Sequence, residues 1–379
     1  KYRGSVMTLI SMCTVLCILI FFMGTNRQYV VESPIDGFNG KWKFNVDKKI
    51  VILFAIVLIC VSTMRYGWID TYAYKEMYLA SRGNLVYVNS APYGVEAGWL
   101  YFCYFLNFFS ASPKLLLFVS AVIIIGAYVS AIEKFSCDPI FSLIIFYCIL
   151  YMDTNNGLRQ MVAASIVIMA YPLLMDRKVW KYIAFVLIVL LATQLHTSAI
   201  VCVFVAAVVT GKPFNKRVKL AMLFGILFCL MPGLMNQYMG SLFSDSKYLY
   251  YLNMSGGMTI FRAFVTGIFP AILALLYLRK CKKNKVMIGY KEGILINILF
   301  VNTMFIVMGS YMQYWNRMGF YTAFAPVVLM PKLAYDMFVR DQRRLVKVLA
   351  ILCYFLFFAY NIYVNIGYGA IKDFYISWN

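Results

Sequence analysis

Residues 155–160 read NNGLRQ, and the apolar run behind them carries no charge from residue 161 to residue 175. A run of this length predicts a membrane-crossing helix, with Asn156 as the polar residue that caps its start. Arg159 then lies in the first turn, where unpaired N–H groups and the helix dipole favour an anion over a guanidinium group. We therefore expect Arg159 to have an anionic partner, and a phosphate bound by both the guanidinium and the helix N-terminus fits best.

The rest of the chain has the composition of an integral membrane protein. Of its 379 residues, 63% are hydrophobic and 13% are charged, against about 25% charged residues in an ordinary soluble domain. Apolar runs that can cross about 30 Å of hydrocarbon recur from end to end, and residues 6–23 are expected to be a retained span rather than a cleaved signal. The sequence predicts an all-α polytopic bundle of about 11–13 membrane helices, a single domain over residues 1–379.

The net charge of +20 comes from lysines and arginines that cluster in short loops between apolar runs. Loop charges of this kind set the orientation of the spans, so nucleic acid is not an expected partner. Ten cysteines are scattered through apolar runs without a Cys-x-x-Cys motif. We expect no disulfide framework, no metal and no cofactor.

The basic loops assign a side of the membrane to each connection. Residues 24–49 are expected to be cytoplasmic, and residues 65–113 and 236–258 are expected to be outer loops. The segment 94–110 is aromatic and apolar but short, and it carries Glu96 near its start. An interfacial or re-entrant helix at this position keeps every later basic loop on the cytoplasmic side.

Residues 176–178 and 212–217 are both basic, and the apolar run between them is broken by the polar residues 193–198. A chain that leaves and returns to the same side must form a hairpin, so two short helices are expected. The first arm, residues 182–195, rises only about 21 Å, which leaves His196 short of the far surface. Non-helical backbone at that depth must line water or protein, so His196 is expected at the floor of an outward-facing cavity.

Arginines recur where helices leave the outer face. Three inward-running helices are expected to begin with a polar cap and an arginine: Asn156 with Arg159, Thr259 with Arg262, and Asn316 with Arg317. Snorkelling toward lipid headgroups is the alternative for each, and it is the preferred explanation for Arg262. For Arg159 and Arg317 together, an anion site is preferred.

His196 is the only histidine of the chain. Ionisable groups at membrane depth mark sites or pathways by default, although a packing role is the alternative. Without a second histidine or a cysteine pair, a metal-ligand role is not expected.

The first outer loop combines carboxylates with aromatic rings. Asp70 and Glu96 are the catalytic candidates there, and an ion pair with Arg65 is the alternative for Asp70. Sugar rings stack on aromatic faces, and the candidates for such contacts are Trp68, Tyr72 and Tyr74. A membrane-interface belt of aromatic side chains explains the same residues.

Several of these segments together resemble a known family. Residues 65–74, the Glu96-x-Gly98 pair, the Asn156-x-x-Arg159-Gln160 helix start and the HTSA segment at 196–199 are similar to the EpsG/Wzy-type polysaccharide polymerase family. The resemblance covers most of the first 210 residues and extends more weakly to residues 316–321. The family spacing of glycine and aspartate beside the loop arginine is stretched here to Gly67 and Asp70. The first outer loop is also similar to that of polytopic GT-C-like glycosyltransferases.

The resemblance implies an enzyme of O-antigen, exopolysaccharide or capsule synthesis in the cytoplasmic membrane of a bacterium. It would join oligosaccharide repeat units that are carried on polyprenyl pyrophosphate, with its active site facing the periplasm or exterior. Its partners would be the lipid-linked donor and acceptor, membrane lipid, a chain-length regulator and a flippase. The residues expected at the pyrophosphate are Arg159, Arg317, Arg65, Arg262, Asn156 and Gln160. His196 would be a general base or a donor to phosphate, and Asp70 or Glu96 would orient or deprotonate the acceptor.

Two other functions remain open from the sequence. A single-sugar transferase that uses a polyprenyl-phosphate sugar would need the same charges at the same face. A lipid-oligosaccharide flippase would need a polar path through the whole bundle, whereas the charged residues here gather toward one side.

Overall fold

The computed structural model describes residues 13–18, 20, 29–31, 42–44, 48–65, 68, 70–231, 259–338 and 342–367. Most of the predicted span 6–23 and the whole predicted outer loop 236–258 lie outside these residues. The described residues are almost entirely helical, which confirms the all-α fold class. They also contain a short antiparallel strand pair that the sequence analysis did not predict, β1 (Tyr29–Val31) with β2 (Trp42–Phe44), in the loop predicted to be cytoplasmic.

Within the described residues, five helices are long and apolar enough to cross a membrane. They are α6 (Lys114–Phe135), α9 (Leu158–Ala170) with η2 (Tyr171–Asp176), α15 (Ile260–Ala263) with the π-helical turn η4 (Phe264–Ile268) and α16 (Phe269–Lys283), α17 (Tyr290–Gly309), and α20 (Arg343–Gly367). Shorter helices complete the bundle: α2 (Lys48–Met64), α7 (Pro139–Ile149), α8 (Tyr151–Thr154), α10 (Val179–Thr193), η3 (Thr197–Ile200), α11 (Val201–Val209), α12 (Lys216–Leu230), α18 (Gln313–Gly319) and α19 (Phe324–Met337). The chain is a polytopic helical membrane protein.

The centre of the bundle is formed by helices that are apolar all round. Every residue of α7 is buried, and 89% of the most apolar 18-residue stretch of α17 is buried against other helices. A helix without a polar face belongs in the interior of a bundle, whereas a helix that is exposed on one side can face lipid. The last helix, α20, has only 33% of the corresponding stretch buried, which is expected of a peripheral span.

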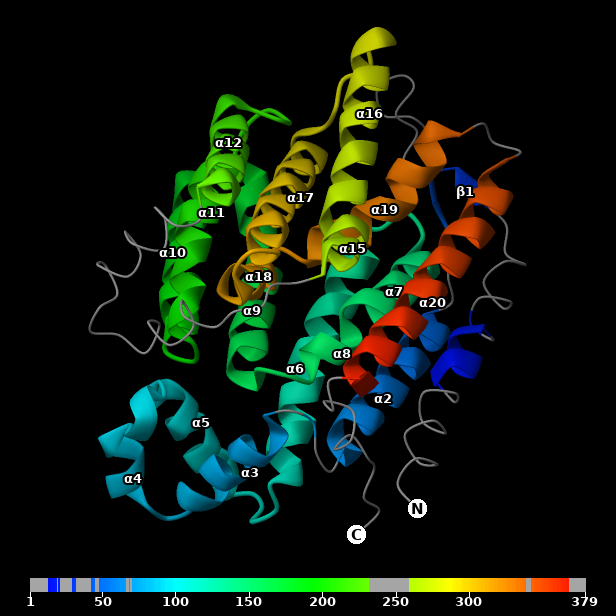
Figure 1. The fold of residues 1–379 in the computed structure, drawn as a ribbon. Coiled ribbons are helices and arrows are strands. Elements are labelled where there is room, and N and C mark those ends of the chain that lie inside the picture. The colour runs from blue at the N-terminus through cyan, green and yellow to red at the C-terminus, as the bar shows by residue number, and fades with distance from the viewer. Residues whose placement is uncertain are drawn as a thin grey trace.

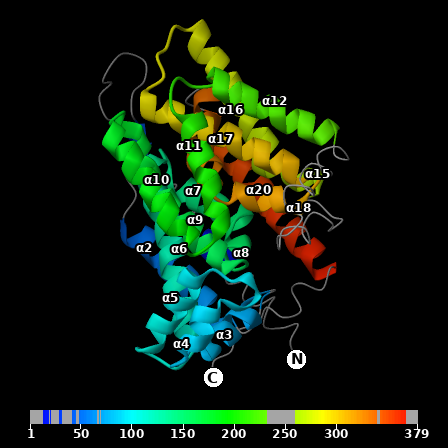
Figure 2. The same ribbon diagram turned by 90° about the vertical axis from the view of Figure 1, so that its left-hand side faces the viewer.

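Three short helices lie beyond one end of the bundle in both views, α3 (Thr71–Ala80), α4 (Leu85–Ser90) and α5 (Ala97–Asn107) (Figures 1 and 2). The turn η1 (Pro92–Gly94) leads from α4 toward α5. The 11 residues of α5 rise about 16 Å, too little to cross a membrane. The structure therefore agrees with the expectation of a short non-crossing helix in this segment.

The predicted hairpin is present. Helix α10 ends at Thr193, the chain turns through Gln194 and Leu195, and η3 and α11 return alongside α10. His196 has extended backbone angles (φ −158°, ψ 115°) between the two arms, so it lies at the tip of the hairpin. In Figure 1 this tip points toward the end of the molecule that carries α3–α5.

Basic turns gather at the opposite end of the bundle (Figure 1). The guanidinium of Arg177, in the turn before α10, stacks over the Tyr290 ring at the start of α17 with 4.0 Å to the ring centroid. Lys280, in the last turns of α16, donates to the Asp336 carbonyl at 2.5 Å. The turns that the sequence analysis grouped on one side of the membrane thus meet in the fold.

Candidate functional site

Three of the predicted site residues meet at the end of the bundle near α5. Glu96 is the residue before α5, Arg159 is the second residue of α9, and His196 is at the hairpin tip. Arg159 Nη1 forms an ion pair with Glu96 Oε2, and His196 Nδ1 lies 3.3 Å from Glu96 Oε1. A carboxylate at the start of α5 therefore joins the start of α9 to the hairpin tip, and we call Glu96, Arg159 and His196 together the Glu96 cluster.

Thr197 adds two hydrogen bonds to the same carboxylate. Its backbone N–H donates to Glu96 Oε1 at 3.1 Å, and its hydroxyl donates to the same oxygen at 3.0 Å. Burial by itself raises the pKa of Glu96, but the hydrogen bonds from His196 and Thr197 and the charge of Arg159 hold that pKa well below its usual range. Glu96 is therefore ionised at neutral pH, and a carboxylate of such low basicity is a poor proton acceptor.

The local backbone explains why Arg159 points toward this carboxylate. Gly157 precedes α9 with φ 60°, a left-handed conformation that glycine adopts without a steric penalty. The prediction that Asn156 caps the helix was wrong, because Gly157 takes the cap position and offers no side chain. Arg159 does have a negatively charged partner in the Glu96 carboxylate, and a phosphate shared with the helix N-terminus stays a prediction.

Tyr74 of α3 brings Arg317 and Asp70 into the same region. Burial raises the pKa of Tyr74 to about 12, while the charges of Arg159 and Arg317 lower it and that of Asp70 raises it. These opposing effects show that both arginines and Asp70 lie within electrostatic reach of one hydroxyl. The charges of Arg159, Arg317 and Asp70 therefore all act on Tyr74.

The prediction that Arg317 begins an inward-running helix was wrong. It lies in the last turn of α18, and the following helix, α19, begins at Phe324. The correction has a simple electrostatic reason, because a helix C-terminus stabilises a cation and a helix N-terminus does not.

Gln160 lies beneath the cluster rather than facing a ligand. Its side chain is buried, and its Nε2 donates to the Arg317 carbonyl at 2.9 Å and lies 3.4 Å from Ser198 Oγ. Ser198 Oγ is 2.9 Å from the Tyr321 hydroxyl. This buried chain ties α9, the hairpin tip and the segment after α18 together. No site role was predicted for Ser198 or Tyr321. Both lie in segments that resemble the polymerase family, residues 196–199 and 316–321, and this resemblance was the only signal for them in the sequence.

Arg65 is buried away from solvent at the end of α2. Its Nη1 donates to the Ser62 carbonyl at 2.5 Å and to Asn155 Oδ1 at 2.8 Å, and its Nε donates to Thr71 Oγ1 at 3.2 Å. These bonds connect α2, α3 and the turn before α9. The guanidinium therefore fixes the end of α2 and the start of α3 relative to the turn before α9.

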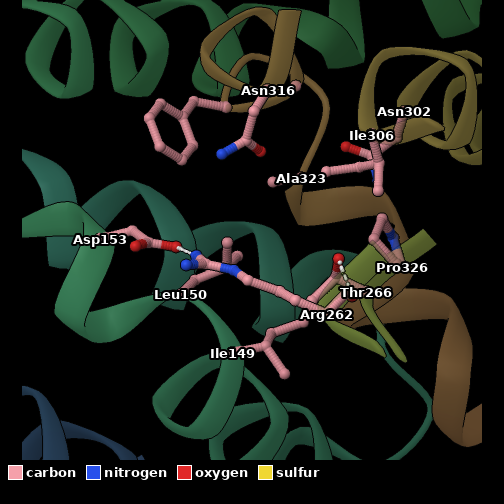
Figure 3. A pocket seen from close by; sticks show the side chains of 12 residues that line it. Ile149, Leu150, Asp153, Arg262, Thr266, Asn302, Ile306, Asn316, Ala323 and Pro326 are labelled. Carbon is pink, nitrogen blue, oxygen red and sulfur yellow. Dashed lines mark hydrogen bonds and ion pairs between the residues drawn. The ribbon is translucent and has the colours of Figure 1, made fainter. Parts of the chain in front are cut away.

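Arg262 occupies a different space. Thr259 caps its helix as predicted, with the hydroxyl accepting from Arg262 N at 3.3 Å, and the guanidinium forms an ion pair with Asp153. Figure 3 shows this pair in a pocket, with the Asn316 amide directed into the same space. The lining of that pocket includes neither Arg159 nor His196, so Arg262 is not part of the Glu96 cluster.

The aromatic candidates separate into buried and exposed residues. Trp68 and Tyr74 are buried, and the Tyr74 ring meets the Trp99 ring edge-on at 5.7 Å. Tyr72 is 71% exposed, two positions from Tyr74 and therefore on another face of α3. Within the part of the chain that the structure describes, no three histidine, cysteine, aspartate or glutamate side chains gather as metal ligands would.

The fold and these contacts define a polytopic helical membrane protein with a charged site formed by the start of α5, the start of α9 and a hairpin tip. The model of the EpsG family matches residues 48–375, and the chain belongs to that family. Membership indicates a polysaccharide polymerase of the glycosyltransferase type and confirms the resemblance seen in the sequence. Comparisons with curated proteins and with solved structures each gave no match.

Proposed function

We propose that the protein polymerises oligosaccharide repeat units carried on polyprenyl pyrophosphate, at the outer face of the cytoplasmic membrane of a bacterium. A hydroxyl of the acceptor sugar attacks the anomeric carbon of the donor, and the lipid pyrophosphate leaves. The observation that carries this proposal is the contact of Arg159 and His196 with Glu96 where α5, the start of α9 and the hairpin tip meet, with Arg317 tied to α9 through the hydrogen bond from Gln160.

The cations fit a pyrophosphate leaving group. Negative charge develops on the pyrophosphate as its bond to the sugar breaks, and positioned arginines and helix N-terminal N–H groups stabilise such charge. Arg159 places a guanidinium beside the N-terminal N–H groups of α9, and the cap residue of this helix offers no side chain to those groups. Its side chain is 21% exposed, so a ligand can reach it despite the ion pair with Glu96. Gln160 acts indirectly in this proposal, by holding the backbone of Arg317.

The other groups fit the acceptor. An attacking hydroxyl needs a proton acceptor, and His196 is near neutral pH the most suitable side chain in the cluster. Asp70 lies within reach of Tyr74, where it can accept a hydrogen bond from a sugar hydroxyl. Arg159, proposed for the donor, and His196, proposed for the acceptor, both contact Glu96.

The proposed orientation follows from the basic turns. Turns rich in lysine and arginine stay in the cytoplasm, and the turn before α10 and the end of α16 lie at the end of the bundle opposite α3–α5 (Figure 1). The Glu96 cluster then faces outward, where lipid-linked repeats are expected.

The test is an elongation assay on membranes that contain the full chain, with a lipid-linked single repeat as donor and acceptor. Arg159→Ala should abolish the polymer ladder and leave single repeats on lipid, and Arg159→Lys should recover part of it because the charge remains. Arg82→Ala is the matched control, because Arg82 is an exposed arginine at the same end of the molecule.

Other outcomes of this assay decide against the proposal. A ladder of normal length from Arg159→Ala would remove that residue from donor binding. A product extended by a single sugar in the wild-type protein would indicate a single-sugar transferase. Movement of the repeat across a vesicle membrane without any new glycosidic bond would indicate a flippase.

A further inference from the structure

One ring nitrogen of His196 faces the Glu96 carboxylate. Nδ1 lies 3.3 Å from Glu96 Oε1, within the cluster. Glu96 is also held by Arg159 and Thr197, and its side chain is only 7% exposed. An ionised carboxylate has no proton to donate, so it can only accept from the imidazole. A neutral imidazole beside it therefore carries its proton on Nδ1.

We infer that Glu96 is a positioning residue that fixes the Nδ1–H tautomer of His196 and leaves Nε2 as the atom that takes the acceptor proton. This inference rests on the proposed function, and it decides between the two roles that the sequence left open for His196. An Nε2 without a proton can accept from a sugar hydroxyl, and it cannot donate to a phosphate oxygen. Arginine, and not histidine, then serves the pyrophosphate.

The carboxylate can impose this tautomer because its own position is fixed from several sides. Thr197 donates to Oε1 from its backbone at 3.1 Å and from its hydroxyl at 3.0 Å, and Arg159 binds Oε2. Three donors other than the imidazole thus hold Glu96, so it does not depend on His196 for its orientation. If the imidazole alone moves, the Glu96 carboxylate that accepts its hydrogen bond stays in place.

The approach of α5 to the hairpin tip depends on Gly98, two residues after Glu96. A Cβ at this position would lie 2.4 Å from the Gln194 carbonyl oxygen and 2.8 Å from its carbonyl carbon. A residue without a side chain is therefore required where the first turn of α5 meets the end of α10. Gly98 therefore helps to keep Glu96 close to the hairpin tip that carries His196.

The transfer step then balances. A bond forms between the acceptor hydroxyl oxygen and the anomeric carbon of the donor, and the bond from that carbon to the pyrophosphate oxygen breaks. The electron pair of the broken bond stays on the pyrophosphate oxygen, which faces Arg159. The hydroxyl proton goes to His196 Nε2, the resulting imidazolium is stabilised by Glu96, and the proton is later released to water.

The single histidine makes a direct test practical. Full-length protein with ¹⁵N-labelled histidine, purified in lipid nanodiscs, gives one pair of ring-nitrogen signals, because His196 has no counterpart in the chain. At a pH where the ring is neutral, we expect a protonated Nδ1 and an unprotonated Nε2. Glu96→Ala should move the proton toward Nε2, and Glu76→Ala, which removes an exposed glutamate of α3, should leave both signals unchanged.

The outcomes separate this inference from the proposed function. A wild-type ring protonated mainly on Nε2, or signals that do not respond to Glu96→Ala, would overturn the role of Glu96 whatever the enzyme polymerises. In the elongation assay, His196→Ala should lower kcat by about 10²-fold or more. Normal kcat in that variant, with the Nδ1–H tautomer intact in the wild type, would overturn the base role and leave the positioning contact standing. A wild-type protein that makes no polymer would count against the proposed function alone.

Discussion

Replacing Gly98 with alanine tests the contact on which the geometry of the cluster depends. The added Cβ would lie 2.4 Å from the Gln194 carbonyl oxygen, whereas ordinary van der Waals contact begins at 3.4 Å. Two of the three nearest atoms belong to the Gln194 backbone, so no side-chain rotation relieves the clash. Helix α5 or the hairpin tip must move by about 1 Å, the difference between these two distances.

A displacement of this size is enough to affect catalysis. Glu96 is two residues from Gly98, and its bonds to Thr197 are 3.0 and 3.1 Å long, so a shift of about 1 Å takes them beyond hydrogen-bonding distance. Misplacement of a catalytic group by about 1 Å costs on the order of 10²-fold in rate. We expect Gly98→Ala to lower the elongation rate by about that factor.

The assay measures polymer formation per molecule of folded protein in membranes. Gly126→Ala is the control, since no atom lies within 4 Å of the Cβ it would add and alanine favours its helix, α6. Elongation at the wild-type rate by Gly98→Ala, with normal expression, would refute the reasoning that α5 must approach the hairpin this closely. Equal losses in both variants would refute it as well.

Three further predictions concern buried polar groups. Gln160→Leu removes the side-chain donor to the Arg317 carbonyl, which keeps the Phe320 N–H at 3.2 Å, so we expect a loss of about 0.5–1.5 kcal/mol of stability and shorter polymer, measured by thermal unfolding and by product ladders. Because the pKa of Glu96 is lowered in the folded protein, its stabilising effect is present above the unfolded value of about 4.3 and is lost as the pH falls toward the folded value. The difference in unfolding temperature between the wild type and Glu96→Gln should therefore shrink below about pH 4, and a constant difference would contradict this sign. Lys347→Met leaves Asp138 without its cation, 2.6 Å away in a buried pair, and should cost about 3–5 kcal/mol in chemical unfolding, most of it recovered by adding Asp138→Asn.

Local patterns in the sequence were sufficient for much of the fold. Uncharged apolar runs predicted the membrane helices, and two basic turns on either side of a broken run predicted the hairpin that carries His196. The dipole argument predicted that Arg159 needs an anionic partner. Each of these inferences uses residues that are neighbours in the chain, so the physics that governs them can be read without the fold.

The identity of the partners could not be predicted in the same way. Glu96 is 63 residues from Arg159 and 101 residues from Thr197 in the sequence, and no local pattern indicates which carboxylate will contact them. Gln160 neighbours Arg159 in the sequence, yet successive helical positions are rotated by about 100°, so one faces Glu96 and the other is buried. Two such steps, about 200°, separate the buried Tyr74 from the exposed Tyr72.

The ion pair between Arg159 and Glu96 affects how the expected anion site could bind its substrate. An arginine at a helix start is destabilised when nothing negative is near, so a site that binds its anionic substrate only part of the time needs a permanent counter-charge. Glu96 supplies it from the start of α5, which packs against the hairpin tip at Gly98. A pyrophosphate that bound Arg159 alone would have to compete with this carboxylate. A pyrophosphate that also engaged Arg317 and the first-turn N–H groups of α9 would add donors that Glu96 leaves unused, which is why we assign the donor to both arginines and not to Arg159 by itself.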